Sequence, residues 1–380
     1  MGRRPGEPRR LPARLLAAAG ALASLSIGCS RQPAEGTVGV LVPLSGALKP
    51  WGREMSDGIR LAWDQGPSPE RPKLLHNDSP GDPREATVAF EELLDQDARM
   101  VIGPLTTDEV MAAGLVARRR KTPLVAPAAT GMGILGAEPS FTVRLCYGDD
   151  EAAAALASFA ETELHLQRMA LVVDLGSSYA LGLADAFACA FQERRGRIVD
   201  SVYYRADDPD RLQALDAVAA MDVQGALLAG YAPDLVPMVK AARSPHLASL
   251  VFLGGDGWAD PELQRALAGR VAGAYHTRHF NPSAGTPEVR AFLEAWSLHH
   301  PEPPGDFAAL GFDAARVVLS VFDGSLDGTA QQRRLAGLTD FPGVTGIISL
   351  DQRGAAIRMP IVIESFHERE GPRIVTTLGG

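Results

Sequence analysis

The 380-residue chain has little of what several protein classes depend on. Three cysteines are too few for a disulfide-rich scaffold, and neither a CxxC motif nor a Cys/His cluster indicates a zinc site. The eight histidines are scattered along the chain. After residue 28, no apolar stretch reaches the ~20 residues that a membrane-spanning helix needs. The sequence therefore predicts no metal, no cofactor and no transmembrane helix in the mature chain.

Catalytic motifs are missing as well. The stretch 176–180, Gly-Ser-Ser-Tyr-Ala, differs from GxSxG, and the sequence contains no SxxK, HExxH or P-loop. Residues 131–136 fit GxGxxG, but Glu138-Pro139 would stop the long helix that a dinucleotide site needs at this point. We therefore predict that the protein is not an enzyme.

The N-terminus has the features of an export signal. Five arginines precede or border an apolar stretch over 15–27, which is too short to remain in a membrane as a helix, and Gly28-Cys29 follows. A small residue before a cysteine is typical of bacterial lipoprotein signals, so we predict lipidation of Cys29. Ser26 stands where these signals usually have Leu, which leaves an ordinary secretory signal as the alternative. Either signal predicts an exported protein, and the lipid would anchor it to a bacterial membrane, in the periplasm or at the cell surface.

Removal of residues 1–28 changes both the charge and the cysteine content. This segment carries five Arg and one Glu, a net charge of +4, so the mature chain carries −13 against −9 for the whole sequence. A strongly acidic chain is poorly suited to phosphate contacts, so we expect no nucleic-acid partner. Cys146 and Cys189 remain, and the sequence favours two free thiols while leaving a disulfide open.

The remaining chain alternates between short apolar stretches and amphipathic stretches with helical spacing. In 83–97, Asp82 can cap the helix and Pro83 fits its first turn. Buried strands that alternate with helices predict parallel sheets covered on both faces, and about 350 residues favour two lobes. The expected strands are 38–42, 100–102, 123–125, 169–173, 226–228, 250–253 and 271–275, and the expected helices are 53–65, 83–97, 108–119, 150–163, 179–194, 233–242, 287–299 and 307–322.

Small, hydroxyl, aromatic and acidic residues follow these strands. Ligands bind beyond the carboxyl ends of the strands in an open α/β sheet, so this composition predicts a binding cleft. Thr106 and Glu109 form a capping box, which places Thr107 at a helix start that faces the cleft. Hydroxyls and free N–H groups at a helix N-terminus suit a carboxylate, and Asp256, between glycines at a strand end, suits an ammonium group.

The order and spacing of these segments resemble the leucine/isoleucine/valine-binding family of solute-binding proteins over residues 37–370. The matching segments are PLSG at 43–46, WG and DGIRLA within 51–62, NDSPGDPREA at 77–86, IGPLTT at 102–107, APAAT at 126–130, GSSYALGL at 176–183, AGY at 229–231, GGDG at 254–257 and FDAA at 312–315.

The resemblance implies a type I periplasmic-binding fold. This fold has two α/β lobes, each a mostly parallel sheet flanked by helices, joined by three hinge crossings. The crossings are expected near Leu145, 276–278 and 354–358. Lobe 1 would comprise 36–145 and 279–355, and lobe 2 would comprise 146–278 and 356–372.

The resemblance also implies the ligand-binding residues. Thr107 and Thr130 match positions that hold the α-carboxylate of an amino acid, and Asp256, with the Ala128 carbonyl, would hold its α-amino group. Aromatic side chains would wall the cleft, namely Trp51, Tyr179, Tyr231 and Phe312, the last where Tyr is common. Taken singly, each residue also has a structural explanation as a cap, a turn or core packing. Trp51 is the least suited to a core, because it precedes Gly52 in an expected loop.

These observations together predict a monomeric lipoprotein that binds a small polar ligand, an amino acid by preference. Closure of the lobes would capture the ligand, and an ABC permease would receive it. Two alternatives stay open: a regulatory or structural lipoprotein on the same fold, similar to activators of penicillin-binding proteins, and a ligand sensor. The sequence does not name the ligand's side chain.

Overall fold

The computed structural model describes residue 2 and residues 36–66, 71–136, 140–367 and 371–379. The predicted signal and Cys29 lie outside the described residues. In the described part of the chain, no helix is both long and apolar enough to cross a membrane. Cys146 is buried and Cys189 is exposed, and the two thiols are free.

The first sheet contains five strands, all parallel, in the order β2-β1-β3-β4-β5. Their apolar side chains are almost fully buried in β1, β3, β4 and β5, as expected for strands covered on both faces. The strands are β1 (Thr37–Val42), β2 (Lys73–Asp78), β3 (Ala98–Ile102), β4 (Leu124–Ala126) and β5 (Thr142–Arg144). The helices associated with this part are α1 (Lys49–Gln65), α2 (Pro83–Asp95), α3 (Thr107–Arg120), α9 (Pro287–Ser297), α10 (Asp306–Val321) and α11 (Gly328–Ala336).

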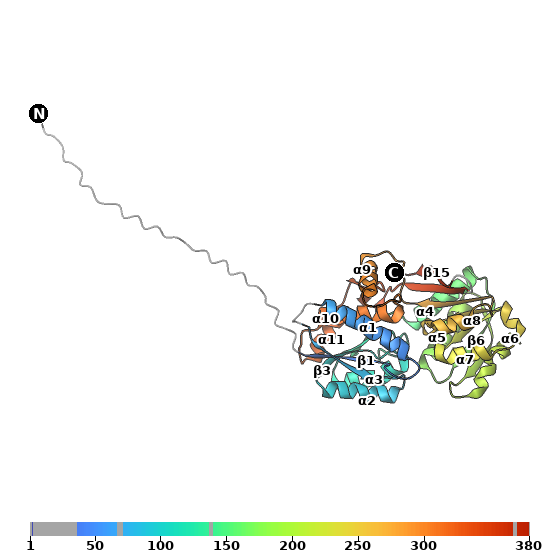
Figure 1. Cartoon of the computed structure of the whole chain (residues 1–380), viewed down its shortest axis with the longest axis horizontal. Helices are drawn as coiled ribbons and strands as arrows, with labels where there is room; N and C mark the ends of the chain where they lie inside the picture. The colour runs from blue at the N-terminus through green and yellow to red at the C-terminus, as the bar shows by residue number, and fades with distance from the viewer. Residues whose placement is uncertain (1, 3–35, 67–70, 137–139, 368–370, 380) are drawn as a thin grey trace. The chain divides into compact units, whose positions relative to one another are not determined.

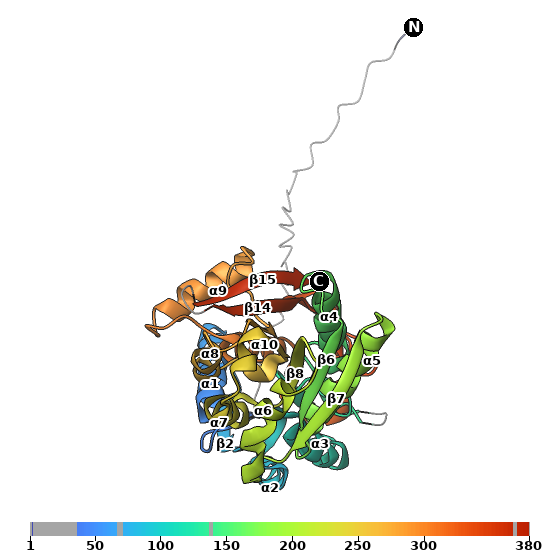
Figure 2. The same cartoon turned by 90° about the vertical axis from the view of Figure 1, so that its right-hand side faces the viewer.

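The second sheet contains seven strands in the order β15-β14-β10-β9-β8-β6-β7. Strands β6 to β10 run parallel, whereas β14 and β15 are antiparallel additions that lie side by side at one edge (Figure 2). The strands are β6 (Arg168–Asp174), β7 (Arg197–Tyr204), β8 (Gly225–Ala229), β9 (Val251–Gly254), β10 (Gly273–Arg278), β14 (Ile361–His367) and β15 (Gly371–Leu378). The helices of this part are α4 (Asp149–Thr162), α5 (Ser178–Glu193), α6 (Ala214–Ala219), α7 (Ala232–Ala241) and α8 (Pro261–Leu267).

The chain passes between the two sheets where strands of one sheet end. It leaves the first sheet after Arg144, and it leaves the second after Arg278 and returns to it at Ile361. A small third sheet precedes that return and is made of β11 (Phe341–Pro342), β12 (Ile347–Leu350) and β13 (Ala356–Ile357). The two sheets give the two-lobed α/β architecture that the sequence predicts, while the residue limits of the lobes stay a prediction.

The start of α1 differs from the expectation. The helix begins at Lys49 rather than near residue 53, so Trp51 lies in its first turn and not in a loop. Pro50 fits the first turn of a helix, which explains the earlier start. A Cβ at Gly52 would lie 1.8 Å from the carbonyl oxygen of Pro43, so only glycine lets α1 pack this closely against the end of β1. Helix α1 then packs along α10 (Figure 1).

Candidate functional site

One small cavity collects most of the residues predicted to bind the ligand. Its volume is about 10 Å³, and it lies beyond the carboxyl ends of strands from both sheets. Six of the eight predicted ligand-binding residues line it, together with Leu105, Ala129, Gly257 and Phe307; the six are Trp51, Thr107, Ala128, Thr130, Tyr231 and Asp256. Segments far apart in the sequence therefore meet at the place that the strand order favours for a ligand.

The N-terminus of α3 forms the hydroxyl side of the cavity. The predicted capping box is present: Thr106 Oγ1 accepts from the Glu109 backbone N–H, and Glu109 accepts from the Thr106 N–H. Glu109 also accepts from Ser79 Oγ at 2.5 Å, which fixes the cap from another segment. Thr107 is the first helical residue, and its Oγ1 accepts from the Gly131 N–H at 3.2 Å. The Thr107 hydroxyl and the helix N-terminus are thus in place for a carboxylate.

Thr130 lies next to this helix start, and two hydrogen bonds to its backbone carbonyl hold it in place. Its carbonyl accepts from Arg144 Nη1 at 3.1 Å and from the Asp149 N–H at 3.0 Å. A Cβ at the neighbouring Gly131 would lie 2.2 Å from Thr107 Cγ2, so glycine is required for Thr107 and Thr130 to approach each other. The segment after β4 and the start of α3 therefore form one rigid unit.

Asp256 provides the acidic side of the cavity, from the second sheet. It begins a short 3₁₀ helix after β9 and is 9% exposed, and its Oδ1 atom has no hydrogen-bond partner among the described residues. Burial, and after it the charge of Asp256, raises the pKa of Asp149 to about 8 and holds the pKa of Tyr231 well above its usual value. The carboxylate is thus a buried negative charge whose effect reaches the surrounding groups.

Aromatic rings form the wall between these two sides. Trp51 stacks on Phe307 with ring centroids 4.8 Å apart and meets Tyr231 edge-on at 6.1 Å. Tyr179 does not line the cavity; it stacks behind Tyr231 at 4.9 Å, and its hydroxyl accepts from the Gly257 N–H. In this arrangement Tyr179 supports the wall from behind, and its contact with a ligand stays a prediction.

Phe312, predicted as a wall residue, is not among the residues that line this cavity. It packs against Phe292 of α9 with ring centroids 4.8 Å apart. Phe307 lines the cavity instead, five residues earlier on α10. Five residues turn a helix by about 140° beyond a full turn, so the two rings face different sides. Phe307 follows a Pro-Pro-Gly loop, which carries no periodicity that could have indicated it.

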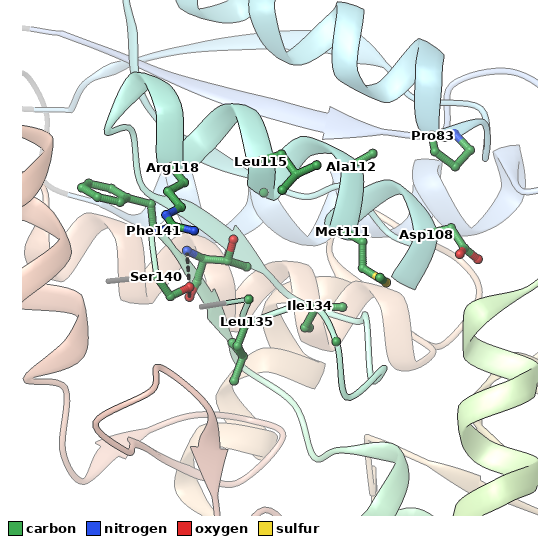
Figure 3. A pocket seen from close by; sticks show the side chains of 14 residues that line it. Pro83, Asp108, Met111, Ala112, Leu115, Arg118, Ile134, Leu135, Ser140 and Phe141 are labelled. Atoms are coloured by element: carbon green, nitrogen blue, oxygen red, sulfur yellow. Dashed lines mark hydrogen bonds between the residues drawn. The ribbon is translucent and has the colours of Figure 1, made fainter. Parts of the chain in front are cut away.

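A larger hollow of about 380 Å³ lies on the outer face of α3 (Figure 3). Met111, Leu115, Ile134 and Leu135 surround it, and none of the predicted ligand-binding residues does. Asp108, Arg118, Ser140 and Thr142 also line it, but all its lining residues lie within 83–142, whereas segments associated with both sheets line the smaller cavity. The smaller cavity is therefore the candidate binding site.

The fold and the cavity together define a two-lobed binding protein, and comparisons with known proteins agree. A family profile described as periplasmic binding protein matches residues 35–363. The Leu/Ile/Val-binding protein BraC3 of Rhizobium johnstonii is 25% identical over 269 residues, 69% of this chain and 72% of that protein. The chain belongs to the periplasmic binding protein family, and the resemblance to Leu/Ile/Val-binding proteins is confirmed.

Solved structures place the fold in the same family. A leucine binding protein from Thermotoga maritima has a TM-score of 0.84 and 26% identity, covering 90% of this chain and 98% of that one. A solute-binding protein of an ABC transporter from R. palustris, in complex with benzoate, shares the fold with a TM-score of 0.78 at 17% identity, covering 90% and 96%. These relatives are solute-binding proteins and not enzymes, as the sequence predicts for this chain.

Proposed function

We propose that the protein is an exported lipoprotein that captures an α-amino acid between its two lobes and delivers it to an ABC permease. One observation carries the proposal. Two threonines line the cavity on the side of the first sheet: Thr107 at the start of α3 and Thr130 after β4. The buried carboxylate of Asp256 lines it on the side of the second sheet. A zwitterion has one group for each side, because a carboxylate suits the helix N-terminus and an ammonium suits the acid.

The rest of the cavity favours a small apolar side chain. Trp51, Phe307 and Leu105 line it, and these groups suit an apolar side chain rather than a charged one. The curated relative and the Thermotoga structure are named for leucine or for Leu/Ile/Val. We therefore place leucine, isoleucine and valine first among the candidate ligands.

An aromatic carboxylate is the second candidate, because the R. palustris relative holds benzoate and rings line this cavity. Benzoate has no ammonium group. Benzoate would therefore leave the buried Asp256 carboxylate without a ligand group to pair with, whereas an amino acid supplies an ammonium. The acid therefore favours the amino acid over benzoate.

A thermal-shift screen of the purified mature chain tests this function. A ligand that binds only the folded state stabilises it by about 2.7 kcal/mol at a hundredfold excess over Kd, so a true ligand raises Tm clearly. Leucine should raise Tm, whereas 4-methylpentanoate, which has the same side chain without the amino group, and benzoate should not. If no amino acid raises Tm, or if 4-methylpentanoate acts as well as leucine, the proposal is wrong.

Lipidation at Cys29 remains part of the proposal and rests on the sequence alone. The wild-type protein should incorporate labelled fatty acid and fractionate with membranes. Cys29→Ala should move it to the soluble exported fraction without changing the ligands found in the screen. A membrane-bound Cys29→Ala protein, together with an unlabelled wild type, would contradict the anchor.

A further inference from the structure

His279 is a buried histidine beside the cavity that the proposed function does not yet use. It follows β10 directly, where the chain leaves the second sheet, and it is 4% exposed. Its ring stacks on Tyr147 with centroids 4.1 Å apart. Its backbone N–H donates to the Asp306 carboxylate at 2.9 Å, and Asp306 is ion-paired with Arg278 at 2.8 Å. Both the backbone and the ring of His279 are therefore held in place.

The imidazole is directed at the acid of the binding site. His279 Nε2 lies 3.5 Å from Asp256 Oδ2. In the described part of the chain, neither Nε2 nor the other oxygen of Asp256 has a hydrogen-bond partner. A neutral imidazole can turn its N–H toward a carboxylate, and a protonated imidazole adds the attraction of a full positive charge. His279 is thus the cation that can compensate Asp256 when no ligand is present.

We propose that His279 is the positioning residue for Asp256 and exchanges its charge with the ligand. In the empty cavity, the imidazolium compensates the carboxylate. When the ligand binds, its ammonium compensates Asp256 instead, and the imidazole releases its proton to solvent, because two cations beside one buried carboxylate repel each other. The inference rests on the proposed function, since it requires a ligand that carries an ammonium group.

The groups around the His279 ring must be considered because another of them could also release a proton when the ligand binds. Tyr147 faces it from the segment after β5, Asp256 from the end of β9, and Asp306, paired with Arg278, from α10. Asp149 also responds to Asp256: burial, followed by the charge of Asp256, raises the Asp149 pKa to about 8. An ammonium beside Asp256 would therefore also release a proton from Asp149, and that release should appear near pH 8.

Calorimetry of the wild-type protein with leucine tests the exchange, in two buffers of different ionisation enthalpy. At pH 5.5 the wild type should release most of one proton per ligand, and at pH 7.5 much less from this group. Its affinity should fall by up to about tenfold per pH unit on the acid side. Asp149→Asn should keep this acid-side behaviour and lose the release near pH 8.

Two variants separate positioning from charge. His279→Gln keeps a donor toward Asp256 without a titrating charge, so its affinity at pH 7.5 should stay within about threefold of wild type while the acid-side proton release disappears. His279→Ala should bind more weakly at every pH and release no proton in acid. Melting curves at pH 7.5 establish that both variants are folded.

Two results would overturn the inference: no proton release by the wild type at pH 5.5, or the same release by His279→Gln. The wild-type measurement needs no variant, so a folding defect cannot hide the answer. A failure of the proposed function would look different, because leucine and the other amino acids would then not bind the wild type at all.

Discussion

Glu54 shows how a single buried acid links structure to pH. It lies on α1, and its Oε1 accepts from the Gly305 N–H at 2.5 Å. Burial, with the charge of Asp306 added, raises its pKa to about 7. Between pH ~4.5 and ~7, the unfolded chain therefore loses this proton while the folded protein keeps it. The contribution of Glu54 to stability is greatest below this range and falls as the pH rises through it.

Glu54→Gln should remove that pH dependence. The amide oxygen can still accept from Gly305, and the variant has no buried charge at high pH. We expect its free energy of unfolding to exceed that of wild type by about 1–2 kcal/mol at pH 8 and to match it at pH 5. Urea unfolding at both pH values checks this, with Glu262→Gln, an exposed partner of Lys240, as the control. A loss of stability at pH 8 would contradict the explanation.

Local signals predicted the capping residues and the polar side of the cavity. The box of Thr106 and Glu109 and the cap by Asp82 depend on residues three or fewer apart, so the sequence is sufficient to find them. Phe307 and His279 were missed because their places depend on how α10 and β10 meet other segments. The spacing of residues along the chain does not indicate that a ring on α10 stacks on Trp51.

Contacts between elements also connect the two parts of the protein. Asp108, on the first turn of α3, accepts from the Ser178 N–H at the start of α5, at 3.1 and 3.3 Å to its two oxygens. A carboxylate at a helix N-terminus is typically worth about 0.3–1 kcal/mol. Because α3 starts after a strand of the first sheet and α5 after one of the second, this contact would be lost if the lobes moved apart.

Asp108→Asn should therefore speed ligand dissociation. The amide still accepts a hydrogen bond but has no charge, so we expect dissociation to be about two- to fivefold faster, with association nearly unchanged. Stopped-flow measurement with leucine checks it. Asp185→Asn, an exposed change in the middle of α5, is the control and should match wild type. Equal dissociation rates for Asp108→Asn and Asp185→Asn would show that the contact does not stabilise closure.

The sequence predicted the long elements well and the edge strands poorly. Helices α2, α3 and α5 lie within two residues of the expected limits, because their apolar faces repeat over several turns. Strands β2 and β7 are two of those that were not predicted. Each forms an edge of its sheet and is only partly buried, so it lacks the apolar run by which the interior strands were found.

At the scale of the whole molecule, side chains associated with the two sheets meet at the cavity, and we expect a ligand to hold the lobes together. Trp51, from α1, touches Tyr231, which follows a strand of the second sheet. Small-angle scattering of the mature chain should give a smaller radius of gyration with saturating leucine than without it. The same concentration of 4-methylpentanoate is the control and should leave the radius unchanged. An unchanged radius with bound leucine would indicate a rigid scaffold.

Asp256→Asn is the most direct test of the central claim, that this cavity binds the ammonium of an amino acid. The change keeps the shape and removes the charge, and disruption of a buried charge pair costs roughly 2–5 kcal/mol, about 30-fold to several thousandfold in affinity. Asp260→Asn is the matched control: Asp260 caps α8 by accepting from the Glu262 and Leu263 N–H groups, so its loss should lower stability more than affinity.

Calorimetry with leucine on both variants decides the question. The account predicts a loss of at least about 30-fold for Asp256→Asn and little change for Asp260→Asn. Leucine binding to Asp256→Asn within about threefold of wild type, a difference of less than 1 kcal/mol, would contradict it.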